Sequence, residues 1–168
     1  MPATLDEKSE RMLVDEMIKK YRQSKARKAA TSNEVALAER ATRLDHQYFD
    51  GRARPTAVRW VTNQNKRWGS ASLHQRTIRL SSNLLHTPEW VQDYVLVHEL
   101  AHLVAPRDGH GPVFQRLLNR FERRVEADQF LAGFSAGYRA HANEQGETVS
   151  VAGFDDVEDE SSELSESV

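Results

Sequence analysis

The segment VLVHELAHLVAPRDGHGPVF, residues 95–114, holds three of the seven histidines of the chain. His98 and His102 are four residues apart and flank Glu99. On a helix, residues four apart lie on one face, with about 5–6 Å between their Cβ atoms. Both imidazoles can therefore bind one ion, since zinc–nitrogen bonds are roughly 2.0–2.1 Å long. Glu99 falls on the adjacent face, where a general base for metal-bound water is expected.

A catalytic zinc site needs a third protein ligand and an open position. Pro106 disfavours helix in the residue before it, so the helix is expected to end near Val104. Gly109 permits a tight turn, and Pro112 favours a new helix start. These features predict that the chain doubles back and places His110 over the metal as the third ligand.

Alternatives remain open for both parts of this site. Glu122 or Glu126, on the following helix, could supply the third ligand in place of His110. The two helical histidines could instead be core residues that hydrogen-bond to neighbours. A buried Glu99 between them would then need a partner, because charged side chains are rarely buried unpaired, and this favours the metal site. Asp108, in the RDG turn, is interpreted as a turn residue rather than a ligand.

Helical periodicity predicts two helices in the N-terminal part of the chain. The first covers residues 9–30 and is basic in its second half. The second follows Thr31 and Glu34, which have the spacing of a capping box. It is expected to end before Gly51 and Pro55, which break the pattern.

Three short segments rich in β-forming residues follow, at residues 57–61, 67–72 and 77–81. They predict a small antiparallel sheet. Thr87 is the expected N-cap of the next helix, which is apolar on nearly every side and should therefore be buried. A further helix is expected from Pro112 onward, with apolar residues at helical spacing.

Length and composition indicate one main domain. The 168 residues are enough to bury a core, and the absence of cysteine excludes disulfides and thiolate metal sites. No apolar run approaches the roughly 20 residues that span a bilayer, and the first residues lack the pattern of a signal peptide. We expect a cytoplasmic protein with no membrane partner. The predicted division is a basic helical segment (1–30), a central domain (31–142) and a disordered acidic tail (143–168).

The charges are distributed unevenly along the chain. Residues 144–168 contain nine acidic and no basic residues, which leaves 23 basic against 16 acidic side chains before them. Clustered basic residues in the first helix are candidate nucleic-acid contacts, because phosphate binding draws on such clusters. These residues are Lys19, Lys20, Arg22, Lys25, Arg27 and Lys28. The alternative is an ordinary solvated basic face, with a tail that only aids solubility.

Four motifs together resemble those of the SprT-like and YgjP-like zinc metallopeptidases. They are KRWGSAS (66–72), IRLSSNLL (78–85), VLVHELAHL (95–103) and GHGPVF (109–114). The resemblance covers roughly residues 40 to 130. It implies an α+β, zincin-like minimal metallopeptidase in which N-terminal helices and a small antiparallel three-stranded sheet precede the HExxH helix and a following helix.

The resemblance also assigns roles to the site residues. It implies Zn²⁺ as the cofactor, His98, His102 and His110 as its ligands, and Glu99 as the catalytic base. The sequence departs from the YgjP-like pattern at Ala71, where RWGSCS is usual, and at Asn83, where many members have a basic residue.

The leading hypothesis is a zinc-dependent hydrolase of peptide bonds, in which Glu99 activates a zinc-bound water. Segment 67–72 or 77–81 could pair with an extended protein or peptide substrate, with Trp68 and Arg79 as substrate-side candidates. One alternative is hydrolysis of a small phosphorylated or otherwise activated molecule, with Arg67, Arg76 and Arg79 as its anion-binding residues. Another is a nucleic-acid-associated protein whose peptidase acts on DNA-bound proteins.

Overall fold

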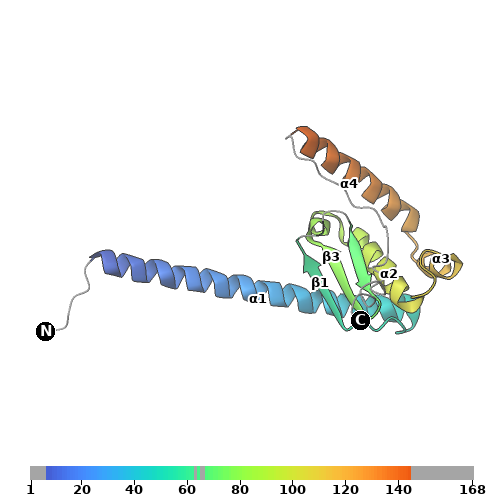
Figure 1. The fold of residues 1–168 in the computed structure, drawn as a ribbon, viewed down its shortest axis with the longest axis horizontal. Helices are drawn as coiled ribbons and strands as arrows, with labels where there is room; N and C mark the ends of the chain where they lie inside the picture. Colours follow the sequence, from blue (N-terminus) through green and yellow to red (C-terminus); the bar gives the residue numbers. More distant parts are fainter. Residues whose placement is uncertain (1–6, 63, 65–66, 145–168) are drawn as a thin grey trace, which may run out of the picture. The chain divides into compact units, whose positions relative to one another are not determined.

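The computed structural model describes residues 7–62, 64 and 67–144 (Figure 1). In chain order the elements are α1 (Glu7–Phe49), β1 (Ala57–Val61), β2 (Gly69–Ser72), β3 (Thr77–Ser81), the 3-10 turn η1 (Ser82–His86), α2 (Glu89–Val104), α3 (Pro112–Leu118) and α4 (Arg124–Glu144). The chain divides into two compact units, Met1–Ala36 and Leu37–Val168. The predicted acidic tail from residue 145 onward lies outside the described residues. No helix in the described ranges combines the length and apolarity that a membrane span requires.

The N-terminal part forms one helix, so the prediction of two separate helices is wrong. Helix α1 continues through residues 31–34, where a capping box was expected to start a new helix. Neither Gly nor Pro occurs between residues 3 and 50, so nothing in the sequence ends the first helix there. The helix ends where Asp50 (φ 56°) and Gly51 (φ 71°) adopt left-handed conformations, as helix C-termini commonly do.

The sheet has three strands, as predicted, but it is mixed rather than antiparallel. The strand order is β1-β3-β2, with β2 and β3 antiparallel and β1 and β3 parallel. Strand β1 therefore lies on the opposite side of β3 from β2. The alternation of apolar and polar residues is the same for both strand directions, so it could not predict this pairing. The registered residues Val58, Ile78 and Ala71 are all buried and form the inner face of the sheet.

Helix α2 packs against this inner face and forms the centre of the second unit. Every residue from Tyr94 to Leu103 is buried, and the helix ends at Val104, as predicted. Its N-cap is Pro88 rather than Thr87. The Thr87 hydroxyl instead donates to the carbonyl of Leu84 at 2.7 Å, which closes the preceding η1 turn.

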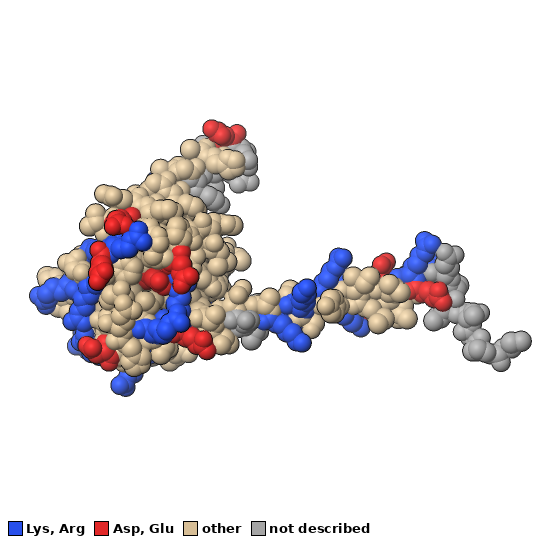
Figure 2. All heavy atoms as spheres, turned by 180° about the vertical axis from the view of Figure 1, so that it is seen from behind, with Lys and Arg blue, Asp and Glu red and all other residues tan. Residues whose placement is uncertain are grey.

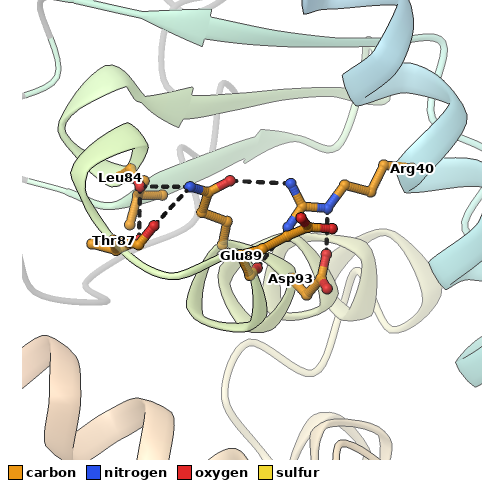
Figure 3. Close-up of polar contacts among 6 residues, drawn as sticks. Arg40, Leu84, Thr87, Glu89 and Asp93 are labelled. Carbon is orange, nitrogen blue, oxygen red and sulfur yellow. Dashed lines mark hydrogen bonds and ion pairs between the residues drawn. The ribbon is translucent and has the colours of Figure 1, made fainter.

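A side chain from α1 holds the start of α2, as Figure 3 shows. Arg40 Nε donates to Asp93 Oδ1 at 2.5 Å, and its other nitrogens donate to Gln92 Oε1 at 3.0 Å and to the Glu89 carbonyl at 2.6 Å. Gln92 in turn donates to the carbonyl of Leu84 at 2.9 Å. The part of α1 that belongs to the second unit is thereby fixed to the start of α2.

The chain after α2 folds into two helices instead of the single one expected. Helix α3 ends at Leu118, and α4 begins at Arg124. The Phe121 side chain, between them, is buried against Tyr94 and Tyr48, with ring centroids 5.5 and 5.7 Å apart. The apolar residues between 112 and 125 therefore include one that is buried in the turn between the two helices. This is why their helical spacing predicted a single helix.

Candidate metal centre

Three imidazole rings converge at the C-terminal half of α2. His98 Nε2 lies 3.3 Å from His102 Nε2 and 3.3 Å from His110 Nε2. The three ligand atoms all lie within 4.8 Å of one another. A tetrahedral ion with metal–nitrogen bonds of roughly 2.0–2.1 Å separates its ligand nitrogens by roughly 3.3–3.4 Å. The two 3.3 Å distances from His98 Nε2 therefore fit ligands of a tetrahedral metal ion.

Hydrogen bonding alone does not account for this arrangement. A ring nitrogen of a neutral histidine offers either one proton or one lone pair. His98 Nε2 approaches two other ring nitrogens at the same distance, so one ordinary hydrogen bond leaves the second approach unexplained. A cation bound by all three nitrogens would account for both approaches.

The rings are packed around a single aromatic side chain. Phe114 is buried, and its ring centroid lies 4.4 Å from that of His102 and 4.9 Å from those of His98 and His110. His98 and His102 are also buried, whereas His110 is exposed. The site is therefore apolar beneath the rings and open to solvent at His110.

Burial keeps the helical histidines neutral. It lowers the pKa of His98 well below its usual value, and the neighbouring His102 and His110 lower it further. Burial also lowers the pKa of His102 to about 4, with a smaller contribution from His110. Neutral imidazoles have the free lone pair that metal binding requires, so these two are ready ligands at neutral pH.

The loop that carries His110 is held by Asp108. Its carboxylate accepts the backbone N–H of Phe114 at 2.8 Å, and its carbonyl accepts that of Gly111 at 2.8 Å. Gly109 has a φ of 55°, and a Cβ at Gly111 would meet the Asp108 carbonyl and carboxylate oxygens at 2.8 Å. Asp108 is a turn residue, as predicted, and it also caps the start of α3. Two glycines allow the loop to close tightly around it.

A second set of contacts ties this loop to α4. Gln115 Nε2 donates to the His110 carbonyl at 3.1 Å, and its Oε1 accepts from Arg124 at 2.5 Å. Asp128, also on α4, accepts a hydrogen bond from the Tyr94 hydroxyl at 2.6 Å. Tyr94 lies on α2, one turn before His98. The backbone of one ligand and the helix of another are thus both braced from α4.

Glu99 is buried beside the histidines but is not part of the group that converges on the metal position. Burial raises the pKa of its carboxyl to about 8, and Arg67 partly opposes this. A bound cation would act in the opposite direction, because it stabilises the carboxylate. Gly69, at the start of β2, leaves the space for this side chain: a Cβ there would lie 2.7 Å from Glu99 Oε1.

The other predicted site residues have different places in the structure. Glu122 and Glu126 are exposed, and neither belongs to the converging group. Trp68 is buried against Phe134 of α4, with ring centroids 5.5 Å apart, so its indole is a core group and not an accessible substrate contact. Arg79 is exposed on the outer face of β3, away from α2. The six basic residues between Lys19 and Lys28 that were predicted as nucleic-acid contacts are all exposed.

Sequence reasoning missed several residues that support the centre. Gly69 lies in the RWGS motif, but only the space that its missing side chain leaves for Glu99 explains why glycine is needed there. Gln115 and Arg124 belong to patterns typical of any solvated helix face, so no signal in the sequence distinguishes them. Phe114 is one of the apolar residues at helical spacing after Pro112, and nothing in that pattern shows that its ring lies against all three histidines.

The buried HExxH helix, the third histidine and the small sheet are the features of an HExxH metallopeptidase. The YgjP-like metallopeptidase domain matches residues 4–127, and the chain belongs to this family of metallopeptidases. The predicted resemblance to YgjP-like enzymes is therefore confirmed.

One solved structure is also similar to the chain. It is the crystal structure of the metallopeptidase zymogen of Pyrococcus abyssi abylysin, with a TM-score of 0.47 and 22% sequence identity over 66% of this chain and 97% of that chain. No curated protein matches the sequence.

Proposed function

We propose that this metallopeptidase is a zinc enzyme whose ligands are His98, His102 and His110 and whose general base is Glu99. The observation that carries the proposal is the pair of 3.3 Å nitrogen–nitrogen distances centred on His98, with a buried carboxylate on the next residue. Nitrogen ligands at tetrahedral spacing, without thiolates or further carboxylates, suit zinc. When bound, zinc lowers the pKa of a water toward about 7 and polarises the scissile carbonyl.

Glu99 has the position and surroundings that general-base catalysis needs. Its carboxylate takes a proton from the attacking water while the water oxygen bonds to the carbonyl carbon. It then delivers that proton to the amine nitrogen as the carbon–nitrogen bond breaks. Its burial between α2 and Gly69 holds the carboxylate in one place through both transfers.

The substrate would be an extended peptide paired with β2. Strand β3 is central and paired on both sides, so segment 77–81 has no free edge, whereas β2 is an edge strand. The Ser81 N–H donates to the Trp68 carbonyl at 2.9 Å, so Trp68 is a residue whose backbone groups point toward β3. Along an antiparallel strand, every second residue points its N–H and C=O toward the same neighbour. The backbone groups of Gly69 and Ala71 therefore point away from β3. A peptide that pairs with these groups would run beside Glu99.

Two of the three arginines that a small phosphorylated substrate would need have other places in the structure, and only Arg67 acts on Glu99. Arg76 donates to the backbone carbonyls of Arg52, Ala53 and Arg54, so its guanidinium braces a loop. Arg79 lies on the outer face of the sheet. The hypothesis of nucleic-acid binding is supported only by the exposed basic residues of α1. The family match does not support it.

The test compares wild type with Glu99→Gln in cleavage of a peptide library, with the metal content of both proteins measured. Glu99→Gln should keep stoichiometric zinc and lose roughly 10²- to 10⁴-fold in rate. Glu122→Gln, which changes an exposed glutamate outside the centre, is the matched control and should cleave like wild type. Unchanged cleavage by a zinc-loaded Glu99→Gln enzyme would show that another group is the base.

Zinc itself is tested by elemental analysis of wild type and His110→Ala after purification without an affinity tag. Near-stoichiometric zinc in wild type and a sharp decrease in the variant are expected. Wild type that stays metal-free when zinc is offered would contradict the proposed centre.

A further inference from the structure

The N-terminal unit carries an exposed apolar stripe. Six large apolar side chains within ten residues of α1 are exposed by 43–69%: Met12, Leu13, Val14, Met17, Ile18 and Tyr21. At about 100° per residue, all but Met12 fall within an arc of about 140° on one side of the helix. The stripe lies within the first unit, whereas the three histidines belong to the second.

This stripe needs a partner to explain it. Every side chain from Glu10 to Ala29 is exposed, so no tertiary packing within the described residues supports this length of helix. Helices in water gain most of their stability from packing of an apolar face, and contiguous exposed apolar surface marks interaction sites. Helical patterns much longer than 25 residues without internal caps are typical of coiled coils.

Three residues of the stripe, Val14, Met17 and Tyr21, belong to a regular ridge with charged ends. Steps of four and three residues connect a row of six positions: Glu10, Val14, Met17, Tyr21, Ser24 and Lys28. This is the spacing of the contact positions of a coiled coil. The row is symmetric about residue 19, with an acidic group at one end and a basic group at the other.

We propose that this ridge binds the same ridge of a second copy of the chain, with the two helices antiparallel. With residue 19 at the centre, Met17 contacts Tyr21 of the partner subunit and Val14 contacts Ser24 of the partner subunit. Glu10 then lies opposite Lys28 of the partner subunit, and the same pairs recur in reverse. Both charged ends of the ridge are thus neutralised by the other copy.

The charges around the ridge favour the same orientation. Residues 7–16 carry four acidic and two basic side chains, whereas residues 19–28 carry six basic and no acidic ones. On the face drawn in Figure 2, acidic and basic side chains lie together toward the N-terminal end of this segment, and only basic ones follow. In an antiparallel pair, the acidic residues 7–16 of one helix lie against the basic residues 19–28 of the other. In a parallel pair, the six basic residues of one helix would lie against the six of the other and repel them.

The interface is short, so the association should be weak and reversible. The ridge from Glu10 to Lys28 is about 27 Å long at 1.5 Å per residue. A dimer of this size depends on protein concentration, and its charged ends make it sensitive to salt.

A charge swap tests the pairing without changing the net charge. Glu10→Lys places lysine against lysine at both ends, and Lys28→Glu places glutamate against glutamate. Each single variant should dimerise roughly tenfold more weakly than wild type at low salt, as measured by sedimentation equilibrium. The double variant Glu10→Lys/Lys28→Glu should restore the wild-type constant, because opposite charges again face each other.

The cysteine-free chain allows the orientation to be tested directly. An equimolar mixture of Val14→Cys and Ser24→Cys should give a mixed disulfide on mild oxidation. Neither variant should cross-link to itself, because like positions are about 15 Å apart along the antiparallel pair and disulfides need Cα atoms within about 7 Å.

Several results would overturn the proposal. Wild type that stays monomeric up to its solubility limit excludes self-association. Disulfides of Val14→Cys with itself show a parallel pair. A double variant that does not recover dimerisation contradicts the charge pairing. If all variants then bind duplex DNA or anionic phosphatidylserine vesicles according to their net charge, the ridge binds a polyanion and not a second copy.

Discussion

Helix α2 and the first part of α1 are both continuous helices without Gly or Pro, yet their surroundings are opposite. All residues of α2 from Tyr94 to Leu103 are buried, whereas all residues of α1 from Glu10 to Ala29 are exposed. In α2, burial shifts the pKa values of His98 and Glu99 and keeps the side chains in fixed positions. The comparison teaches that a helical pattern predicts the helix, while its packing decides whether its polar residues can perform chemistry.

The largest expected contrast is in folding stability. Leu96→Ala, at a fully buried position of α2, should lower the free energy of unfolding by about 2–5 kcal/mol, because it leaves a cavity in the core. Met17→Ala, at a position exposed by 64%, should change it by less than about 0.5 kcal/mol in the monomer. Urea unfolding at low protein concentration measures both. Equal effects would mean that the exposed stretch is packed in solution.

The next contrast concerns the space beside Glu99. Gly69→Ala should lower kcat/KM by roughly 10- to 100-fold, because the added methyl displaces the carboxylate. Zinc content should not change, since the ligands are on other elements. Gly133→Ala on α4 is the matched control, because a Cβ there meets nothing within 4 Å. It should leave the rate unchanged, and a Gly69→Ala enzyme of normal activity would contradict the role of this contact.

The support of the third ligand should have a smaller effect. Gln115→Ala removes the hydrogen bond to the His110 carbonyl and the link to Arg124, so zinc affinity should fall about tenfold. Competition with a chelating dye measures this without any substrate. Gln129→Ala, at an exposed position of α4, is the control and should bind zinc like wild type. Equal affinities for the two variants would show that the His110 loop needs no support from Gln115.

The smallest contrast compares two ion pairs made by α1. Arg40 and Asp93 retain 13% and 25% side-chain exposure, whereas Lys20 and Glu16 retain 74% and 62%. Arg40→Met should cost about 1–2 kcal/mol in unfolding free energy, because Asp93, Gln92 and the Glu89 carbonyl all lose a donor. Lys20→Met should cost less than about 0.5 kcal/mol. If both substitutions cost the same, the Arg40 clamp adds no stability beyond a surface pair.

The parts of the fold that local sequence predicts are those with a local cause. The end of α2 at Val104 follows from Pro106, and the start of α3 at Pro112 follows from the fixed φ of proline. The two predicted N-terminal helices form one helix because the Thr31–Glu34 spacing offers a cap, but no residue there ends the preceding helix. The parallel pairing of β1 with β3 depends on a crossing of the chain that no strand pattern encodes.

Spacing along one helix was enough to predict His98, Glu99 and His102 as candidate site residues, because 3.6 residues per turn place them side by side. The family membership follows from the same motifs. The partners of these residues depend on the tertiary fold. It brought His110 within 3.3 Å of His98, placed Gly69 against Glu99 and made β2 an edge strand. Such contacts join distant parts of the chain, and their geometry depends on packing that local residue patterns do not specify.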